Sequence, residues 1–360
     1  YRENNPVRSF QSSVGPRLHF GLGGIDRIDT LIVYWPNNQQ TIQTNVAVDQ
    51  FLVIDQQTAS TVPVTAGKVK SGKLPFQDIT TTLNWGYTHR ENEFSDFDRD
   101  WLIYHMISTE GPKTAVADVN GDGLDDFFIG GAANALAALF VQKPDGSFAS
   151  TNEALFRQEA GSEDLDCLFF DADGDGDQDL YVARGGNEFL VTKQLLVDQL
   201  YLNDGQGNFS RSPQFLPTPK MESSSCVEAA DYDQDGDPDL LVGIRLVPGY
   251  YGVPGNAYIL QNDGKGRFSN VTPEIAPDLD RIGMVTDVRW LDYDQDEDLD
   301  FVIIGDWMPI TFFENKSGQF RKATKVLSDK KTHGWWNAME MGDFDQDGDL
   351  DIILGNHGLN

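Results

Sequence analysis

Short runs of β-branched and aromatic residues alternate with polar turns along most of the chain, and the repeats show no helical periodicity. After residue 110 the order is regular: an apolar run, an acidic loop, a second run, a third run, a glycine turn and a phenylalanine. The third run and its turn end at Phe148, Phe209, Phe268 and Phe320. Asn-Asp-Gly or Pro-Asp-Gly between two strand-like runs favours a hairpin. Each repeat therefore predicts four short strands, with the acidic loop between the first two and the hairpin between the last two.

The acidic loop anchors an internal repeat. It opens the segments DVNGDGLDDFFIGG, DADGDGDQDLYVARGG, DYDQDGDPDLLVGI, DYDQDEDLDFVIIGD and DFDQDGDLDIILGN, whose first aspartates lie 53, 60, 61 and 51 residues apart. A fixed period made of four-strand units is typical of a β-propeller, in which each unit is one blade. We therefore expect an all-β propeller over residues 76–360, with four complete blades and half of a fifth.

The chain before the repeats predicts a different structure. Residues 1–65 contain alternating strands around a turn at 36–38 and carry no acidic loop, which indicates a small β domain. Residues 66–75, rich in small residues, lysine and proline, predict a linker. Residues 76–80 resemble the fourth-strand segment at 268–272. Since propellers close by pairing strands from both termini, we expect 76–80 to be a closing strand of an incomplete ring.

The formal net charge of −30 is concentrated in the acidic loops. Five nine-residue windows, each starting at the first aspartate of a loop, hold 25 of the 57 Asp and Glu residues. Outside them the acids nearly balance the 27 Lys and Arg residues. No basic stripe offsets this field, which argues against nucleic-acid binding. No apolar stretch reaches the roughly 18 residues that a membrane span needs, so we expect no membrane insertion.

The loops follow the pattern D-x-[DN]-x-D-G-x-x-D, which suits calcium. Calcium prefers about six to eight oxygen ligands from carboxylates, carbonyls and water. Side chains at positions 1, 3, 5 and 9 supply oxygens, the backbone carbonyl of position 7 adds another, and glycine at position 6 permits the turn. We expect five calcium ions, held by Asp118, Asn120, Asp122, Leu124 and Asp126; Asp171, Asp173, Asp175, Asp177 and Asp179; Asp231, Asp233, Asp235, Asp237 and Asp239; Asp292, Asp294, Asp296, Asp298 and Asp300; and Asp343, Asp345, Asp347, Asp349 and Asp351.

Two details refine this expectation. An EF-hand would need a glutamate at position 12 and flanking helices, whereas the loops have apolar residues there and strand-like runs after them. The fourth loop has Glu297 in place of glycine, so we expect its site to be strained or weaker. We expect the calcium to be structural rather than regulatory, because each ion would tie the first strand of a blade to the second.

Two further regions are candidates for ligand binding. Alternate positions of the first strands are polar, including Asp166, Glu228, Asp287 and Arg289, and would face a central channel that is either water-filled or a ligand site. The loops after the second strands gather at one face, where aromatic residues either pack between blades or contact a ligand. The candidate residues on this face are Asn187, Tyr250, Tyr251, Trp307 and His357.

The two cysteines and the absence of catalytic motifs bear on the chemistry that the chain could perform. Cys167 and Cys226 each precede an acidic loop within an apolar run. They are either buried free thiols or a bridge between adjacent strands. The sequence contains no HExxH, GxSxG or phosphate-binding loop, so we expect no enzymatic activity.

The five loops resemble the FG-GAP/VCBS repeats of integrin α-subunit propellers, and the resemblance covers residues 76–360. The segment HFGLGGIDRIDTLIVYWPNNQQTIQTNV resembles the end of an ASPIC/UnbV domain, as found beside such repeats in secreted or surface proteins of bacteria. The resemblance implies a ring of about seven blades. It also implies an extracellular or cell-surface protein, either secreted or a bacterial surface lipoprotein, that recognises a protein or glycan ligand.

Two other functions remain open at this stage. One is an accessory subunit of an outer-membrane nutrient-uptake complex. The other is a calcium-dependent polysaccharide lyase, which a cluster of Arg, Lys and His at one channel mouth would favour. An acidic or aromatic mouth would not favour it.

Overall fold

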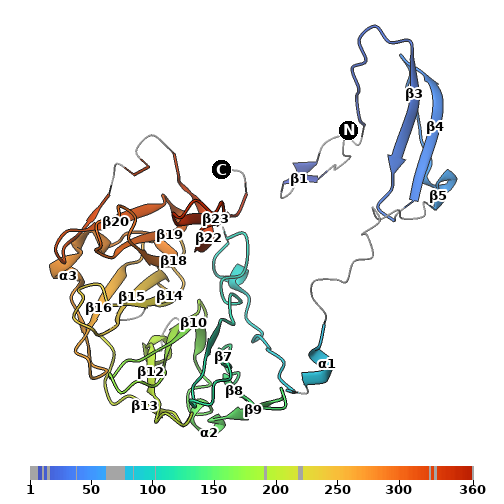
Figure 1. Cartoon of the computed structure of the whole chain (residues 1–360). Helices are drawn as coiled ribbons and strands as arrows, with labels where there is room; N and C mark the ends of the chain where they lie inside the picture. Colours follow the sequence, from blue (N-terminus) through green and yellow to red (C-terminus); the bar gives the residue numbers. More distant parts are fainter. Residues whose placement is uncertain are drawn as a thin grey trace. The chain divides into compact units, whose positions relative to one another are not determined.

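The computed structural model forms two compact units, which divide between Asp78 and Ile79 (Figure 1). The described residues are 7–9, 12–13, 17–37, 39–61, 78–83, 85–101, 103–189, 193–217, 222–323, 326–327 and 331–358. The predicted linker at 66–75 lies outside them. No helix among these residues is long and apolar enough to cross a membrane.

In the part that the structure describes, the N-terminal unit contains two small antiparallel sheets. One pairs β1 (Val7–Ser9) with β2 (Ser12–Ser13), and the other has the order β3 (Arg27–Tyr34), β4 (Gln39–Ala47), β5 (Ser60–Thr61). A 3-10 turn, η1 (Gln56–Thr58), precedes β5 and is capped by the Asp55 carboxylate. Strands β3 and β4 flank the predicted turn, and Tyr34 pairs with Gln40 across it.

The second unit is built of the predicted four-stranded blades, each an antiparallel sheet in chain order. The first has β6 (Thr114–Ala117), β7 (Asp126–Ile129), β8 (Ala138–Gln142) and β9 (Phe148–Thr151), and the second β10 (Glu163–Phe170), β11 (Asp179–Gly185), β12 (Gln199–Leu202) and β13 (Ser210–Arg211). The third has β14 (Ser223–Ala230), β15 (Asp239–Leu246), β16 (Ala257–Asn262) and β17 (Phe268–Asn270), and the fourth β18 (Met284–Leu291), β19 (Asp300–Met308), β20 (Thr311–Asn315) and β21 (Phe320–Lys322).

The fifth repeat contributes two strands, β22 (Gly334–Gly342) and β23 (Asp351–Asn356). β22 also pairs with the end of β19, so these strands extend the sheet of the fourth blade. The blades follow one another in an arc, from green through yellow to red in Figure 1. The structure confirms the all-β propeller architecture, while the number of blades in a full ring stays a prediction.

Short helices occupy connections within this unit. They are α1 (Thr80–Leu83), η2 (Asp96–Asp98), α2 (Glu153–Phe156), η3 (Lys193–Leu196), α3 (Thr272–Ile275) and η4 (Pro277–Leu279). The predicted closing strand at 76–80 is wrong for its described part. Residues 78–79 lie in no strand, and Thr80 begins α1, because the Leu83 N–H bonds the Ile79 carbonyl within a helical turn. Residues 76–77 lie outside the described residues.

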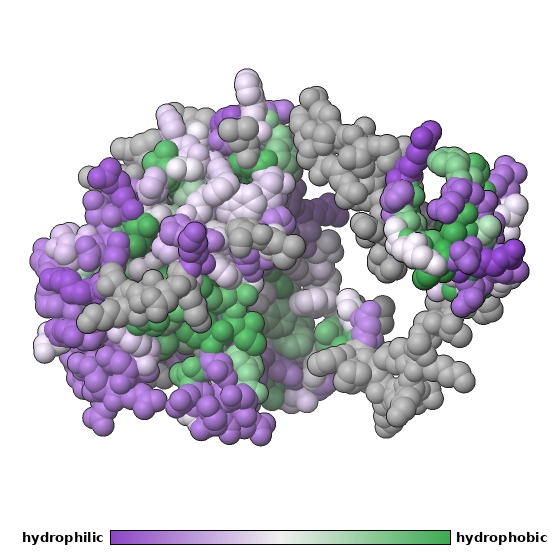
Figure 2. Space-filling view, turned by 90° about the horizontal axis from the view of Figure 1, so that it is seen from above, coloured by the Kyte–Doolittle hydropathy of each residue, from purple (hydrophilic) through white to green (hydrophobic). Residues whose placement is uncertain are grey.

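The hydrophobic core lies between neighbouring blades. Between the third and fourth blades, Tyr232 stacks on Trp290, and Phe301 stacks on Phe313. The second strands of the four blades are largely buried, and every residue of β15 is buried, whereas β23 of the fifth repeat is half-buried to exposed. This explains why the second strands read as continuous apolar runs rather than alternating ones. In the view from above, hydrophilic residues gather along the left and lower border of this unit (Figure 2).

Residues 85–113, which we call the strap, connect the blades across one face. The strap packs Trp85 and Tyr87 on the first blade and Tyr104 on Trp335 of β22. Between these ends its Asp96 binds Asn187 after the second blade's β11, and its Glu110 binds Arg245 of the third blade. The strap lies on the face of the loops that follow the second strands, which we call the rim face; the acidic loops lie on the opposite, acidic face.

Candidate metal centres

The five acidic loops share one backbone conformation, held by the position 1 aspartate. The Asp118 carboxylate accepts hydrogen bonds from the N–H groups of Gly121, Asp122 and Gly123 at 2.8–3.1 Å. Asp171, Asp231, Asp292 and Asp343 accept equivalent bonds in their loops. The position 5 aspartate accepts from the N–H of position 7 in every loop. The carboxylates therefore fold the backbone around themselves.

Two positions in every loop adopt positive φ. Position 6 does so as predicted, and in the fourth loop Glu297 takes φ +72° where the other loops have glycine. Position 4 does so as well, as Gly121 or Gly174 in the first two loops and as Gln234, Gln295 or Gln346 in the others. Sequence reasoning missed position 4, although its glycines in the first two loops were a visible signal. A non-glycine residue in this region is strained, which supports the expectation for Glu297.

In three of the blades the position 9 aspartate joins the second strand to the acidic loop and to the end of the third strand. Asp179, the first residue of β11, accepts the Ala172 N–H of the loop at 3.0 Å and the Asn203 N–H, just after β12, at 2.8 Å. Asp126 and Asp300 make the same pair of bonds in their blades. These aspartates are buried, and burial raises the pKa of Asp179 to about 7. A cation in the loop would favour the ionised form of such a group.

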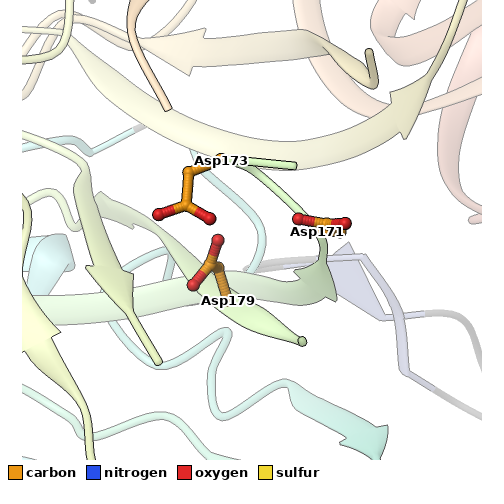
Figure 3. Close-up of side chains that lie close together, drawn as sticks. All are labelled: Asp171, Asp173 and Asp179. Atoms are coloured by element: carbon orange, nitrogen blue, oxygen red, sulfur yellow. The ribbon is translucent and has the colours of Figure 1, made fainter. Parts of the chain in front are cut away.

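The carboxylates converge as a cation would require. In three loops one oxygen each from positions 1, 3 and 9 lies within 4.8 Å of the others, and in the fifth loop positions 1, 3 and 5 do so. Figure 3 shows Asp171, Asp173 and Asp179 around a common space. Buried oxygens of Asp173, Asp177 and Asp233 have no hydrogen-bond partner. Hard oxygen donors with unused lone pairs fit calcium, so these residues fit the group that the repeat pattern implies.

The acidic loops also join neighbouring blades. Asn203, in the hairpin turn of the second blade, donates to the Val119 carbonyl in the first blade's loop at 2.8 Å. Asn262 of the third blade donates to the Ala172 carbonyl in the second blade's loop at 2.9 Å. A cation that orders one loop would therefore also order the contact between two blades.

The inner strands line a cavity of about 430 Å³ that matches the predicted channel. Its charged lining residues are Lys113, Asp166, Glu228, Asp287 and Arg289. Three of the carboxylates accept a backbone N–H from the next blade: Asp166 from Val227, Glu228 from Trp290, and Asp287 from Met339. Arg289 lies 2.9 Å from Asp287 and 3.7 Å from Glu228. These polar residues are thus used in contacts between blades.

The rim face contains an aromatic cluster that we define as Tyr104, Tyr251, Trp307, Trp335 and His357. The rings of Trp307 and Trp335 meet edge to face at 4.5 Å, and Tyr104 stacks on Trp335 and on His357 at 4.4 Å each. Trp307 donates to the Tyr251 hydroxyl at 3.1 Å, and Tyr251 donates to Asp306 at 3.2 Å. The sequence analysis named three of these residues but not Tyr104 or Trp335 as ligand candidates.

The other two predicted rim residues lie differently. Tyr250 is exposed beside the cluster member Tyr251. Asn187 is 0% exposed: its amide donates to Asp96 and Asp100 of the strap, and its oxygen accepts the Gly249 N–H. It organises the strap and a neighbouring loop instead of presenting a surface. Cys167 and Cys226 are buried free thiols and do not form a bridge between adjacent strands, which were the two alternatives that the sequence left open.

Fold and loops together define a β-propeller whose blades carry acidic turns with converging carboxylates. Family comparison is consistent with this class: residues 118–182, 171–242 and 292–354 match the FG-GAP-like repeat, and residues 1–61 match the ASPIC and UnbV family. The repeat matches span more than half of the chain. The chain belongs to the FG-GAP repeat family and carries an ASPIC/UnbV domain before the repeats.

Comparisons with individual proteins add little. No curated protein sequence matches the chain. Among solved structures, the rhamnogalacturonan lyase PL11 of Bacillus licheniformis is 14% identical, with a TM-score of 0.34 over 66% of this chain. The match spans 49% of that lyase. A similarity this distant carries no argument about activity.

Proposed function

We propose that this chain is an extracellular recognition or adhesion module that is stabilised by five calcium ions and binds a protein or glycan at its rim face. The repeat family and the convergent aspartates support the calcium sites. Loops of this kind in extracellular modules bind calcium with Kd of about 10⁻⁴–10⁻³ M, which suits calcium concentrations outside cells. The ions would stabilise the fold at the acidic face, and the ligand would bind at the opposite, rim face.

The observation that carries the ligand site is the conformation of Trp307. Its side chain is 57% exposed and its φ is +63°, a region that bulky residues rarely adopt. Strain of this kind persists where surrounding contacts impose it and is common at binding sites. The ring is fixed by Tyr251 and Trp335, so an exposed indole is held ready for contact. Rigid aromatic surfaces of this type suit protein and sugar partners.

A glycan array and a surface-displayed peptide library, each probed with and without EDTA, would identify the ligand. For a bound probe, we expect the double variant Trp307→Ala/Tyr250→Ala to lose binding while its calcium content stays unchanged. The matched control is Phe215→Ala, which removes an exposed ring between β13 and β14 and should bind as the wild type does. Unchanged affinity of the double variant would exclude the rim face.

We also propose that the chain is not an enzyme. The supporting observation is that the two cations of the central cavity, Lys113 and Arg289, share it with three carboxylates, and Arg289 is paired with two of them. This lining differs from the cationic cluster that a lyase would use to abstract a proton. Cleavage of any polysaccharide by the purified chain would contradict this proposal, provided that cleavage disappears on Arg289→Gln.

A further inference from the structure

A second group of carboxylates lies on the rim face, at the far end of β10 from its acidic loop. Glu163 is the first residue of β10, and Glu188 follows the end of β11. The strap contributes Glu91, His89 and Asn92 to the same place: Asn92 donates to Glu188 at 3.2 Å, and His89 contacts Glu91 at 2.6 Å. We call these five residues the strap cluster.

Several buried polar atoms of the strap cluster have no hydrogen-bond partner in the protein. Glu163 is 1% exposed, and neither of its carboxylate oxygens has a hydrogen-bond partner. Glu188 Oε2, Glu91 Oε2 and Asn92 Oδ1 are also buried without a partner. Buried carboxylates are ordinarily paired or bound to a cation, because an isolated buried charge is very unfavourable. The strap cluster therefore has the buried polar groups of a binding site.

Neighbouring cations do not supply the missing charge. Among the described residues, the only ion pair of Glu91, Glu163 or Glu188 is the one between Glu91 and His89. Arg184, the nearest buried cation in sequence, is directed to Glu159 at 3.0 Å and Asp164 at 3.4 Å. Glu163 and Glu188 are thus left without a cationic side chain in contact among the described residues.

The two central carboxylates approach the same point. A Cβ atom at Gly186 would lie 2.6 Å from Glu188 Oε2 and 3.0 Å from Glu163 Oε2. Gly186 also has φ +107°. Glycine is therefore required there, because a Cβ atom would clash with the carboxylates and because other residues rarely adopt this φ. Two carboxylate oxygens are held against one bare backbone position, and Asn92 of the strap bonds Glu188 beside them. Oxygen donors of this kind select hard divalent cations such as calcium.

We propose that Glu163 and Glu188 bind a divalent cation of the calcium class, with Asn92 as a further oxygen donor. This site lies outside the repeat loops. It joins the second blade to the strap, so its ion would fasten the strap across the rim face. The alternative occupant is a proton: burial and the neighbouring Glu188 raise the pKa of Glu163 well above its ordinary value, and a protonated Glu163 could donate to Glu188.

Metal content separates the two occupants. The full chain is dialysed against millimolar calcium, and bound metal is measured by mass spectrometry. We expect Glu163→Gln/Glu188→Gln to bind one ion fewer than the wild type, as should Asp171→Asn/Asp173→Asn, which disables one acidic loop. The matched control Glu153→Gln, an exposed glutamate bonded to Ser150, should keep the wild-type count. A wild-type count in the Glu163→Gln/Glu188→Gln variant would overturn the proposal and leave the proton.

A crystallographic measurement tests the site without any variant. Wild-type crystals soaked in manganese should show an anomalous difference peak in contact with Glu163 and Glu188, in addition to peaks in the acidic loops. Peaks in the loops together with none at the strap cluster would overturn the proposal, even if the double variant failed to fold.

Discussion

At the residue scale, the acidic loops combine two functions in one short segment. The aspartates at positions 1 and 5 fix the backbone through hydrogen bonds to its N–H groups, and in three loops oxygens of positions 1, 3 and 9 converge. The backbone accepts this only with positive φ at positions 4 and 6. Glutamine occupies position 4 in three loops, so the loop tolerates a side chain there at some energetic expense.

Glu297→Gly tests the strain at position 6. The left-handed region costs a non-glycine residue roughly 1–2 kcal/mol, part of which is offset by the greater freedom of glycine in the unfolded chain. We expect the variant to gain up to about 1 kcal/mol of stability in thermal unfolding with calcium, and to bind calcium more tightly at the fourth loop. Gly236→Ala, at φ +99° in the third loop, should change stability in the opposite direction. A destabilised Glu297→Gly would contradict the role of strain.

The inner-strand carboxylates offer a test by pH. Burial raises the pKa of Glu228 from its ordinary 4.5 to about 7, although Arg289 opposes the shift. Because the folded protein holds this proton more tightly than the unfolded chain, the stability that Glu228 contributes is fully present below about pH 4.5 and is lost as pH rises through about 7. We expect the Glu228 carboxyl resonance to titrate near pH 7 by NMR. Asp287→Asn should lower this midpoint and Arg289→Gln should raise it; a wild-type midpoint near 4.5 would contradict the assignment.

At the scale of elements, the strap is the least expected feature of the molecule. It carries no repeat and no apolar periodicity, yet it contacts successive blades through buried polar residues. Asp96 accepts from the N–H groups of Ile107 and Ser108, from the Ser108 hydroxyl and from Asn187. Hydrogen bonds between such a segment and distant loops leave no regular pattern in the sequence, so the sequence does not predict these contacts.

Asn187→Ala tests how the strap is held. The change leaves Asp96 and Asp100 without a buried amide donor, and leaving such groups unsatisfied costs about 1–3 kcal/mol. We expect a loss of about 2 kcal/mol and faster hydrogen exchange in residues 85–113. Asn208→Ala is the matched control, since Asn208 bonds the exposed Asp204 and its loss should be nearly neutral. Equal exchange in the two variants would show that Asn187 does not hold the strap.

At the scale of the whole molecule, stability is expected to depend on calcium. The loops order contacts within blades and between them, so the ions should bind the folded chain and not the unfolded one. At 10 mM calcium, sites with Kd of about 10⁻⁴–10⁻³ M would each add roughly 1–3 kcal/mol. We expect about five loop-bound ions by elemental analysis and a clear fall in Tm in EDTA. Two or fewer bound ions, or a Tm that EDTA leaves unchanged, would contradict the proposed calcium sites.

The sequence by itself determined the blade, its four strands and the position of every acidic loop. Each of these is local: the loop from Asp171 to Asp179 and the hairpin that ends at Phe209 fold through contacts within one repeat, so a regular pattern is enough to reveal them. The resemblance to FG-GAP repeats followed from the same regularity.

Only the tertiary structure decided what lies between repeats. Whether Asn187 faces solvent or the strap, whether Asp166 bonds a ligand or the Val227 N–H, and whether 78–80 form a strand depend on partners far away in the chain. Glu163 shows most clearly what the sequence cannot predict, because a glutamate at the start of a strand is ordinarily expected on the surface. Its burial beside Glu188 arises only when the strap covers the rim face, and long-range packing of that kind leaves no periodic trace in the sequence.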